Sequence, residues 1–249
     1  MKNNTIRRVL GGLAVAVLGS SLANASSITW YNNIFTAPDS PTSASSSPLG
    51  APNQYAVPWS STVTIPTFNQ TGDTPNTYKQ LTSVQIVMNW VMTGEVDVFN
   101  NSASNLAFTN ATGQVPLLIT GPDGSSFGAT GVAGPISGTA NCCNTITSFP
   151  GLTGSGTQNY NVIGGGLSSY EAFYNGTQTY SLSFTAQDGT FGGTGGSGHL
   201  FYGGSATTGA GVVVTYNYDV VTIPEPGSFV MLGSALLGLG VLIRKRIKA

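Results

Sequence analysis

The stretch that decides the fold class is Val84-Gln85-Ile86-Val87-Met88-Asn89-Trp90-Val91-Met92. Its even-numbered residues are all large and apolar, and this period of two predicts a β-strand with one face turned toward a core. Val87 and Val91 add apolar side chains to the other face, so we expect that face to be partly covered as well. After Gly94, which we expect to form a turn, residues 95–98 resume the alternation.

Outward from this strand, the same period recurs along the chain. Residues 179–186 and 212–220 alternate between apolar and polar side chains, and no segment between residues 26 and 222 has a convincing helical period of 3.6. Many short strands joined by turns predict an all-β domain, an antiparallel β-sandwich or a jelly-roll. The glycine-rich stretches expected to be the turns are 121–134, 151–156, 164–166, 192–198 and 203–211.

Charge is distributed unevenly between the ends and the body of the chain. Seven of the eight basic residues lie before residue 26 or after residue 223, which leaves Lys79 as the only basic residue between them. Eight of the nine acidic residues lie in that body, so its formal charge is −7. A surface that binds nucleic acid needs basic residues to neutralise phosphates. Nucleic acid is therefore excluded as a partner.

The N-terminus has the order of parts of a secretory signal peptide. Lys2, Arg7 and Arg8 form a charged region, a short apolar stretch follows, and Ala23-Asn24-Ala25 supplies the small residues that signal peptidase accepts. This order predicts a signal helix over residues 1–25, with cleavage between Ala25 and Ser26. An amphipathic or core helix is the alternative.

The C-terminus also has three parts in order. Pro224-Glu225-Pro226 precedes an apolar run of 15 residues, Phe229–Ile243, and the basic cluster Arg244-Lys245-Arg246 follows. A helix of that length spans about 22 Å, which is short for a membrane core of about 30 Å, although basic side chains at its end can reach the lipid surface. We expect a short transmembrane helix whose basic cluster stays in the cytoplasm. A buried core helix is the alternative.

These C-terminal parts resemble the PEP-CTERM sorting domain of exported bacterial proteins. The resemblance covers about the last 26 residues, as in other three-part sorting signals. It implies recognition of Pro224, Glu225 and Pro226 by a membrane enzyme of the exosortase type, with processing near that triplet. It also implies a protein that is transiently anchored in the inner membrane and ends at the cell envelope, the cell surface or in the extracellular biofilm matrix.

The body between the two ends resembles the choice-of-anchor E domain, a family of exported bacterial β-proteins. The segments that carry this resemblance are Ile65–Phe68, Leu81–Val84, Asn100-Asn101, Tyr174–Thr177 and Val214–Tyr218. The name of the family describes anchoring and implies no activity. The expected organisation is a signal peptide over 1–25, a Pro/Ser-rich leader over 26–60, one β-sandwich domain over 61–222 and the sorting tail over 223–249.

Several residues have side chains that could act in catalysis, but none of them belongs to a recognised catalytic motif. Glu95, Asp97 and Glu171 are the candidates for a glycosidase pair, although alternation alone explains why Glu95 and Asp97 share a strand face. The single histidine, His199, lacks a nucleophile elbow to work with, whether Asp188 or Asp219 is taken as its acid.

The remaining candidates concern metal and sulfur. Asp123 and Asp188 do not have the spacing of a calcium loop and are expected to be turn residues. Cys142 and Cys143 are adjacent, which leaves a vicinal bridge, free thiols or a bond to another chain as alternatives. We therefore expect no catalytic residue, no metal and no cofactor.

Three hypotheses for function remain after these exclusions. The first is a non-enzymatic exported protein with a structural or interaction role, whose partners are signal peptidase, an exosortase-type enzyme and, before processing, the membrane. The second is a carbohydrate-binding module that places Trp59, Trp90 or Tyr202 against extracellular polysaccharide. The third is a glycoside hydrolase that uses Glu95 or Glu171.

Overall fold

The fold is all-β and mostly antiparallel, as the alternation predicts. A computed structural model describes residues 25–33, 42–43, 52–172, 178–223, 233–237 and 244. Its elements are β1 (Ala25–Asn33), β2 (Thr42–Ser43), β3 (Tyr55–Ala56), β4 (Trp59–Pro66), β5 (Phe68–Asn69), β6 (Thr77–Asn100), β7 (Leu106–Thr120), β8 (Ser126–Ala140), β9 (Thr145–Val162), the 3₁₀ helix η1 (Gly164–Ser169), β10 (Glu171–Ala172), β11 (Thr179–Ala186), β12 (Thr190–Gly195), the 3₁₀ helix η2 (Gly196–Gly198) and β13 (Leu200–Thr222).

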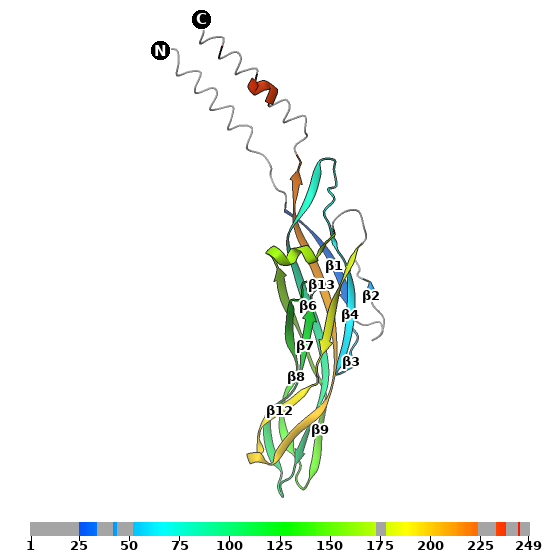
Figure 1. The fold of residues 1–249 in the computed structure, drawn as a ribbon. Coiled ribbons are helices and arrows are strands. Elements are labelled where there is room, and N and C mark those ends of the chain that lie inside the picture. Colours follow the sequence, from blue (N-terminus) through cyan, green and yellow to red (C-terminus); the bar gives the residue numbers. More distant parts are fainter. Residues whose placement is uncertain are drawn as a thin grey trace, which may run out of the picture. The chain divides into compact units, whose positions relative to one another are not determined.

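Two larger sheets hold most of these strands (Figure 1). One has the order β1-β13-β6-β9, with β3 also paired to β13. The other has the order β12-β7-β11-β4-β2, with β8 also paired to β7. The pairs β2/β4 and β5/β10 are parallel, whereas β6/β9, β7/β8, β7/β12, β4/β11 and β7/β11 are antiparallel. This arrangement is consistent with an all-β sandwich.

The chain divides into two compact units. Unit 1 comprises residues 1–26, 70–80 and 218–249, and unit 2 comprises residues 27–69 and 81–217. Most of the described strands lie in unit 2. Within unit 1, the described residues include the first two residues of β1, the loop 70–76, the first residues of β6, the last residues of β13 and a short helix over 233–237.

β6 behaves as its sequence predicts, and it continues further. Every second residue from Val84 to Asn100 is buried, and Val87 and Val91 on the other face are half-buried. The prediction of a turn at Gly94 is wrong, because the strand continues through Gly94 and the same face stays buried. A Cβ atom there would come within 3.3 Å of the Ala133 Cβ and of the Ser205 carbonyl oxygen, so the position needs a small residue rather than a turn.

Most of the glycine-rich stretches are strands, which corrects the expectation that they are turns. Residues 151–156 lie inside β9, residues 203–211 lie inside β13, and residues 126–134 lie in β8. The stretch 164–166 begins η1, and 192–198 spans the end of β12 and η2. The physical reason is close packing, since a Cβ atom on Gly154 would collide with the carbonyl oxygen of Val132 in the other sheet.

Aromatic rings cover several of these strand glycines. Trp90 is the register partner of Gly156, and a Cβ atom on Gly156 would lie 2.7 Å from the Trp90 Cζ2 atom. Phe108 is paired with Gly138 in the same way. A large ring that lies across a glycine on the neighbouring strand fills the space left by the missing side chain. The ring's own apolar surface is buried there.

The core of unit 2 has two recognisable clusters. One contains Val96, Val98, Phe108, Ala111, Ala140 and Leu200, against which Phe149, Phe191 and Tyr202 pack. The other is aromatic and contains Phe68, Tyr170, Tyr180 and Tyr216, all of them buried. The Tyr216 hydroxyl donates to the Pro66 carbonyl oxygen at 2.6 Å and lies 2.9 Å from the Tyr180 hydroxyl, so this polar group is satisfied inside the core.

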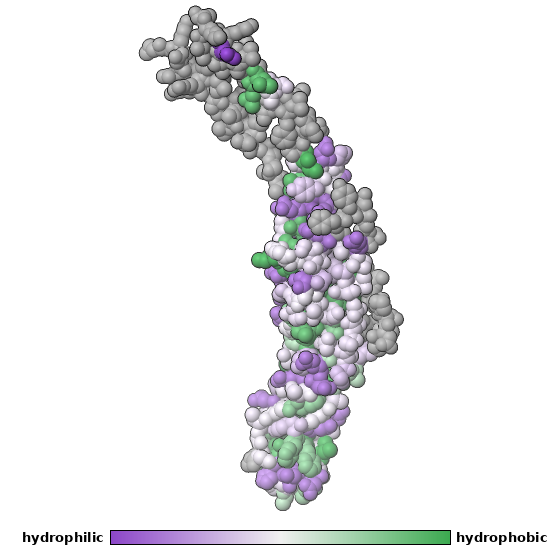
Figure 2. All heavy atoms as spheres, in the orientation of Figure 1, coloured by the Kyte–Doolittle hydropathy of each residue, from purple (hydrophilic) through white to green (hydrophobic). Residues whose placement is uncertain are grey.

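β1 occupies part of the segment that is predicted to be a Pro/Ser-rich leader. Residues 25–33 form a strand of nine residues that joins β13 at the edge of its sheet. β4 begins at Trp59, just before the end of that same segment. Figure 2 shows that much of the coloured surface is pale, as residues of intermediate hydropathy such as glycine, serine and threonine make it.

Candidate functional site

The predicted sorting tail begins at the residue after the last strand. β13 ends at Thr222, and the backbone N–H of Ile223 donates to the Asn76 carbonyl oxygen at 2.6 Å. Pro224, Glu225, Pro226, Lys245 and Arg246 lie outside the described residues, as does Ala23 of the predicted signal cleavage site. The other residues predicted for these sites are described: Ala25 and Ser26 begin β1, and Arg244 is helical.

Part of the predicted apolar run is helical. Residues 233–237 form a short helix in which the Leu236 and Leu237 side chains are 60% and 74% exposed. Over the described part of the chain, none of the helices combines the length and the apolar character needed to span a bilayer.

The acidic candidates lie on strands of two different sheets. Glu95 and Asp97 are half-buried on one face of β6, and the Asp97 carboxylate accepts a hydrogen bond from Ser148 on β9. Glu171 lies on β10, which pairs with β5 instead. Glu95 faces an irregularity in β9, where Pro150 and Gly151 together oppose it. The structure therefore gives Asp97 a role within the sheet.

His199 is held by an amide rather than by a carboxylate. Its Nδ1 atom lies 2.9 Å from the Asn101 Oδ1 atom, and its carbonyl oxygen accepts from the Asn101 backbone N–H at 3.1 Å. Asp188, one of the acids considered for it, lines a different part of unit 2, beside Trp59. This arrangement places His199 at the C-terminal end of η2.

Asp123 stabilises its own turn. Its Oδ1 atom accepts hydrogen bonds from the Ser125 hydroxyl at 2.6 Å, from the Ser125 backbone N–H at 3.2 Å and from the Tyr170 hydroxyl at 3.2 Å. Burial, and then the charge of Asp123, raise the pKa of Tyr170. Within the described ranges, no three His, Cys, Asp or Glu side chains lie close enough together to hold a metal ion.

The three aromatic residues considered for a sugar platform have separate surroundings. Trp90 is buried against Gly156, and Tyr202 packs its ring against Phe108 with centroids 6.4 Å apart. Trp59 is half-buried, and its indole N–H donates to the Thr208 hydroxyl at 2.8 Å. Of the three, Trp59 lines a hollow in the surface.

This hollow lies beside the paired ends of β4 and β11. It is lined by Pro58, Trp59, Ser60, Thr185, Ala186, Gln187 and Asp188. The Gln187 and Asp188 side chains are exposed, while the hydrogen bond to Thr208 fixes the orientation of the Trp59 ring. An aromatic ring next to an amide and a carboxylate offers a stacking surface and hydrogen-bonding groups for a polar ligand.

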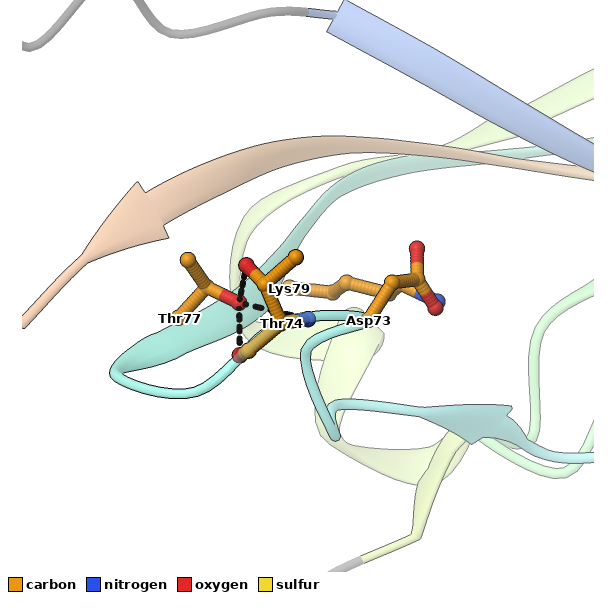
Figure 3. A network of polar contacts seen from close by, with 4 residues as sticks. All are labelled: Asp73, Thr74, Thr77 and Lys79. Carbon is orange, nitrogen blue, oxygen red and sulfur yellow. Dashed lines mark hydrogen bonds and ion pairs between the residues drawn. The ribbon is translucent and has the colours of Figure 1, made fainter.

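The only basic residue of the body has a structural role in unit 1. The Lys79 ammonium lies 2.7 Å from the Asp73 carboxylate (Figure 3). It also lies 5.5 Å from the centre of the Tyr218 ring. The Lys79 side chain is only 12% exposed, whereas that of Asp73 is 76% exposed. The Thr77 hydroxyl closes the same turn by donating to the Thr74 carbonyl oxygen at 2.6 Å. Lys79 is therefore not presented to a polyanion.

Three connections meet at one end of unit 2 (Figure 1). They are the β6–β7 loop (101–105), the β8–β9 loop (141–144) and η2. Asn100, which is fully buried, donates through Nδ2 to the carbonyl oxygens of Ser104 and Ala140, and its Oδ1 accepts from the Ser102 backbone N–H. Sequence reasoning assigned no such role to Asn100. Its position, an even number of residues after the buried residues of β6, is the sequence feature that indicates burial.

The two cysteines lie in this group of loops. The Cys143 thiol donates toward the Cys142 sulfur, with the two Sγ atoms 2.6 Å apart, and neither forms a disulfide here. The contact with Cys142 raises the pKa of the Cys143 thiol. Cys143 is exposed and Cys142 is half-buried.

Comparison with known proteins adds little to this description. No family model matches the chain, and no curated protein matches it. Among solved structures, one of infectious bursal disease virus Gx strain is similar at 14% identity with a TM-score of 0.15, covering 84% of this chain and 44% of that one. A crystal structure of the infectious bursal disease virus VP2 subviral particle is similar at 13% identity with a TM-score of 0.13, covering 83% and 44%. The chain spans less than half the length of these viral chains, and TM-scores this low support no inference about fold or function.

Proposed function

We propose that the chain is an exported protein of the bacterial surface or extracellular matrix, sorted through its C-terminal tail by an exosortase-type enzyme. Its β-domain has a structural or interaction role, and the protein is not an enzyme. The observation that carries the proposal is the order of Pro224-Glu225-Pro226, an apolar run and a basic cluster. The end of β13 at Thr222 supports it, because a processing enzyme needs a segment beyond the last paired strand.

Three of the polar side chains considered for catalysis or metal binding have hydrogen-bond partners in the structure. Asp97 is hydrogen bonded to Ser148, His199 to Asn101, and Asp123 to the donors of its own turn. Each side chain has a partner that accounts for its position. The acidic body and the two basic ends also fit an exported domain, since basic segments are retained on the cytoplasmic side.

The test is the intact mass of the protein secreted by a host that has an exosortase-type enzyme. We expect a mature chain that starts at Ser26 and ends near Pro224. The variant Pro224→Ala/Glu225→Ala/Pro226→Ala should remain full-length at the C-terminus and stay in the membrane fraction. Pro75→Ala, in an exposed loop, is the matched control and should be processed normally. A triple variant processed as fast as the wild type would overturn the assignment.

The hollow beside Trp59 supports a second candidate function, the binding of extracellular polysaccharide. A sugar ring would stack on the indole while Gln187 and Asp188 bind its hydroxyl groups. Because the body carries a formal charge of −7, a neutral polysaccharide is favoured over an anionic one.

Affinity electrophoresis in gels that contain neutral polysaccharides tests this second function. We expect Asp188→Ala and Gln187→Ala to lose the retardation shown by the wild type. Gln114→Ala, another exposed glutamine, is the control and should retain it. Equal retardation of all the variants would place any binding outside the hollow.

A further inference from the structure

The β8–β9 loop brings the only two cysteines of the chain together. Their Sγ atoms lie 2.6 Å apart, whereas the bond of a disulfide measures about 2.05 Å. Neighbouring Cα atoms are about 3.8 Å apart, less than the usual 4.4–6.8 Å of a bridged pair. A bond between neighbours therefore needs a loop that turns both sulfur atoms to the same side, and this loop does so.

The rest of the loop end holds that conformation. The Cys142 backbone N–H donates to the Asn105 Oδ1 atom at 2.8 Å, and the Cys143 N–H donates to the Ser102 carbonyl oxygen at 2.8 Å. The Thr145 hydroxyl bonds the carbonyl oxygen of Cys142 at 2.9 Å. Cys143 has a backbone φ angle of 73°, which residues other than glycine rarely adopt unless surrounding contacts impose it.

We propose that Cys142 and Cys143 form a reversible vicinal disulfide, a redox site whose oxidant is a small-molecule or protein disulfide. The alternative of a metal-binding dithiol has less support. In the described part of the chain, no third His, Cys, Asp or Glu joins the pair in a group that could hold a metal ion.

The reaction is a two-step thiol–disulfide exchange. The exposed Cys143 loses its proton, attacks one sulfur of the oxidant and releases the other as a thiolate, which takes up a proton. Cys142 then loses its proton, attacks Cys143 Sγ and releases the second thiol. The two cysteines together lose two electrons and two protons, and the oxidant becomes two thiols. This redox chemistry does not depend on the proposed export, because any small-molecule or protein disulfide can act as the oxidant.

Intact mass after exposure of the full chain to oxidised glutathione tests the proposal. We expect the wild type to become lighter by two hydrogen atoms and to resist alkylation by iodoacetamide until it is reduced, after which it takes two alkyl groups. Cys142→Ser should instead accumulate as a mixed disulfide with glutathione, because the resolving thiol is missing. Three outcomes would each overturn the proposal. They are two alkyl groups on wild type that was oxidised but not reduced, two bound glutathiones, and a covalent dimer as the main product of the wild type.

A second measurement tests whether the loop end favours the bond. In a glutathione redox buffer, Asn105→Ala should lower the equilibrium constant for disulfide formation about fivefold, the effect of one lost neutral hydrogen bond. Asn101→Ala is the matched control, since Asn101 contacts His199 and should leave the constant unchanged. Equal constants for Asn105→Ala and the wild type would show that the loop contacts do not promote the bond.

Discussion

Two tyrosine hydroxyls of unit 2 differ in how they are satisfied. The buried Tyr202 hydroxyl has no hydrogen-bond partner among the described residues, whereas Tyr216 is bonded to Pro66 and Tyr180. A buried hydroxyl without a partner has lost its hydration without compensation. We therefore expect Tyr202→Phe to raise the free energy of unfolding by up to about 1 kcal/mol and Tyr216→Phe to lower it by about 1–2 kcal/mol.

Urea unfolding of both variants measures this difference. Each change removes one oxygen atom and leaves the ring in place, so Tyr202→Phe and Tyr216→Phe are matched controls for one another. Equal destabilisation by the two would mean that the Tyr202 hydroxyl has a partner in solution.

The strand glycines under aromatic rings give a second prediction at this scale. Alanine at Gly156 would place a Cβ atom 2.7 Å from the Trp90 ring, which is fixed inside the core. We expect Gly156→Ala to lower the free energy of unfolding by about 1–3 kcal/mol through overpacking.

Gly192 is the control for that prediction. It lies in β12, where an added Cβ atom meets nothing within 4 Å. Gly192→Ala should be neutral or stabilise the fold by about 0.5 kcal/mol, because alanine restricts the unfolded chain more than glycine does. Thermal unfolding compares the two, and a neutral Gly156→Ala would show that Trp90 can move aside.

At the scale of elements, Asn100 joins two loops to the end of β6. Its amide is fully buried and makes three hydrogen bonds to backbone groups. Asn100→Ala should lower the free energy of unfolding by about 1–3 kcal/mol, since the buried Ala140 carbonyl oxygen and two partly buried backbone groups lose a hydrogen-bond partner. Hydrogen exchange should show the largest loss of protection in residues 101–105 and 141–144. A loss spread evenly over both sheets would contradict this role.

Alternation along the chain predicted the strands correctly where large apolar residues mark every second position. Residues 84–92 and 179–186 are of this kind, and both bury the expected faces. The expectation that glycine-rich stretches are turns was wrong at residues 151–156 and 203–211, which are strands. Glycine favours turns, but it also fits wherever another backbone or ring approaches a strand closely. A single sequence does not distinguish the two uses, because the approaching ring belongs to a distant segment.

The candidate sites were harder to predict than the strands for a related reason. The adjacency of Cys142 and Cys143 is visible in the sequence, but the loop that turns both sulfur atoms together depends on Asn105 and Ser102 from another connection. The Trp59 hollow likewise requires the pairing of β4 with β11. Lys79 was visible as the only basic residue of the body, but not its contact with Tyr218.

At the scale of the whole molecule, buried tyrosines make the free energy of unfolding depend on pH in the alkaline range. Burial raises the pKa of Tyr170, Tyr180 and Tyr216 above the ordinary value of 10.0. Below about pH 9 these groups are protonated in both the folded and the unfolded chain, so their contribution is constant. Above it the unfolded chain releases protons that the folded chain retains, and the free energy of unfolding falls as pH rises.

The variant Tyr170→Phe tests this dependence on a single group. Its free energy of unfolding, measured in urea from about pH 8 to 11, should fall less steeply than that of the wild type above pH 10, by at most about 1.4 kcal/mol per pH unit. Between about pH 8 and 9 the two curves should run parallel, offset by the lost hydrogen bond to Asp123. Equal slopes above pH 10 would mean that Tyr170 ionises as readily in the folded protein as in the unfolded chain, and that its hydroxyl is open to water.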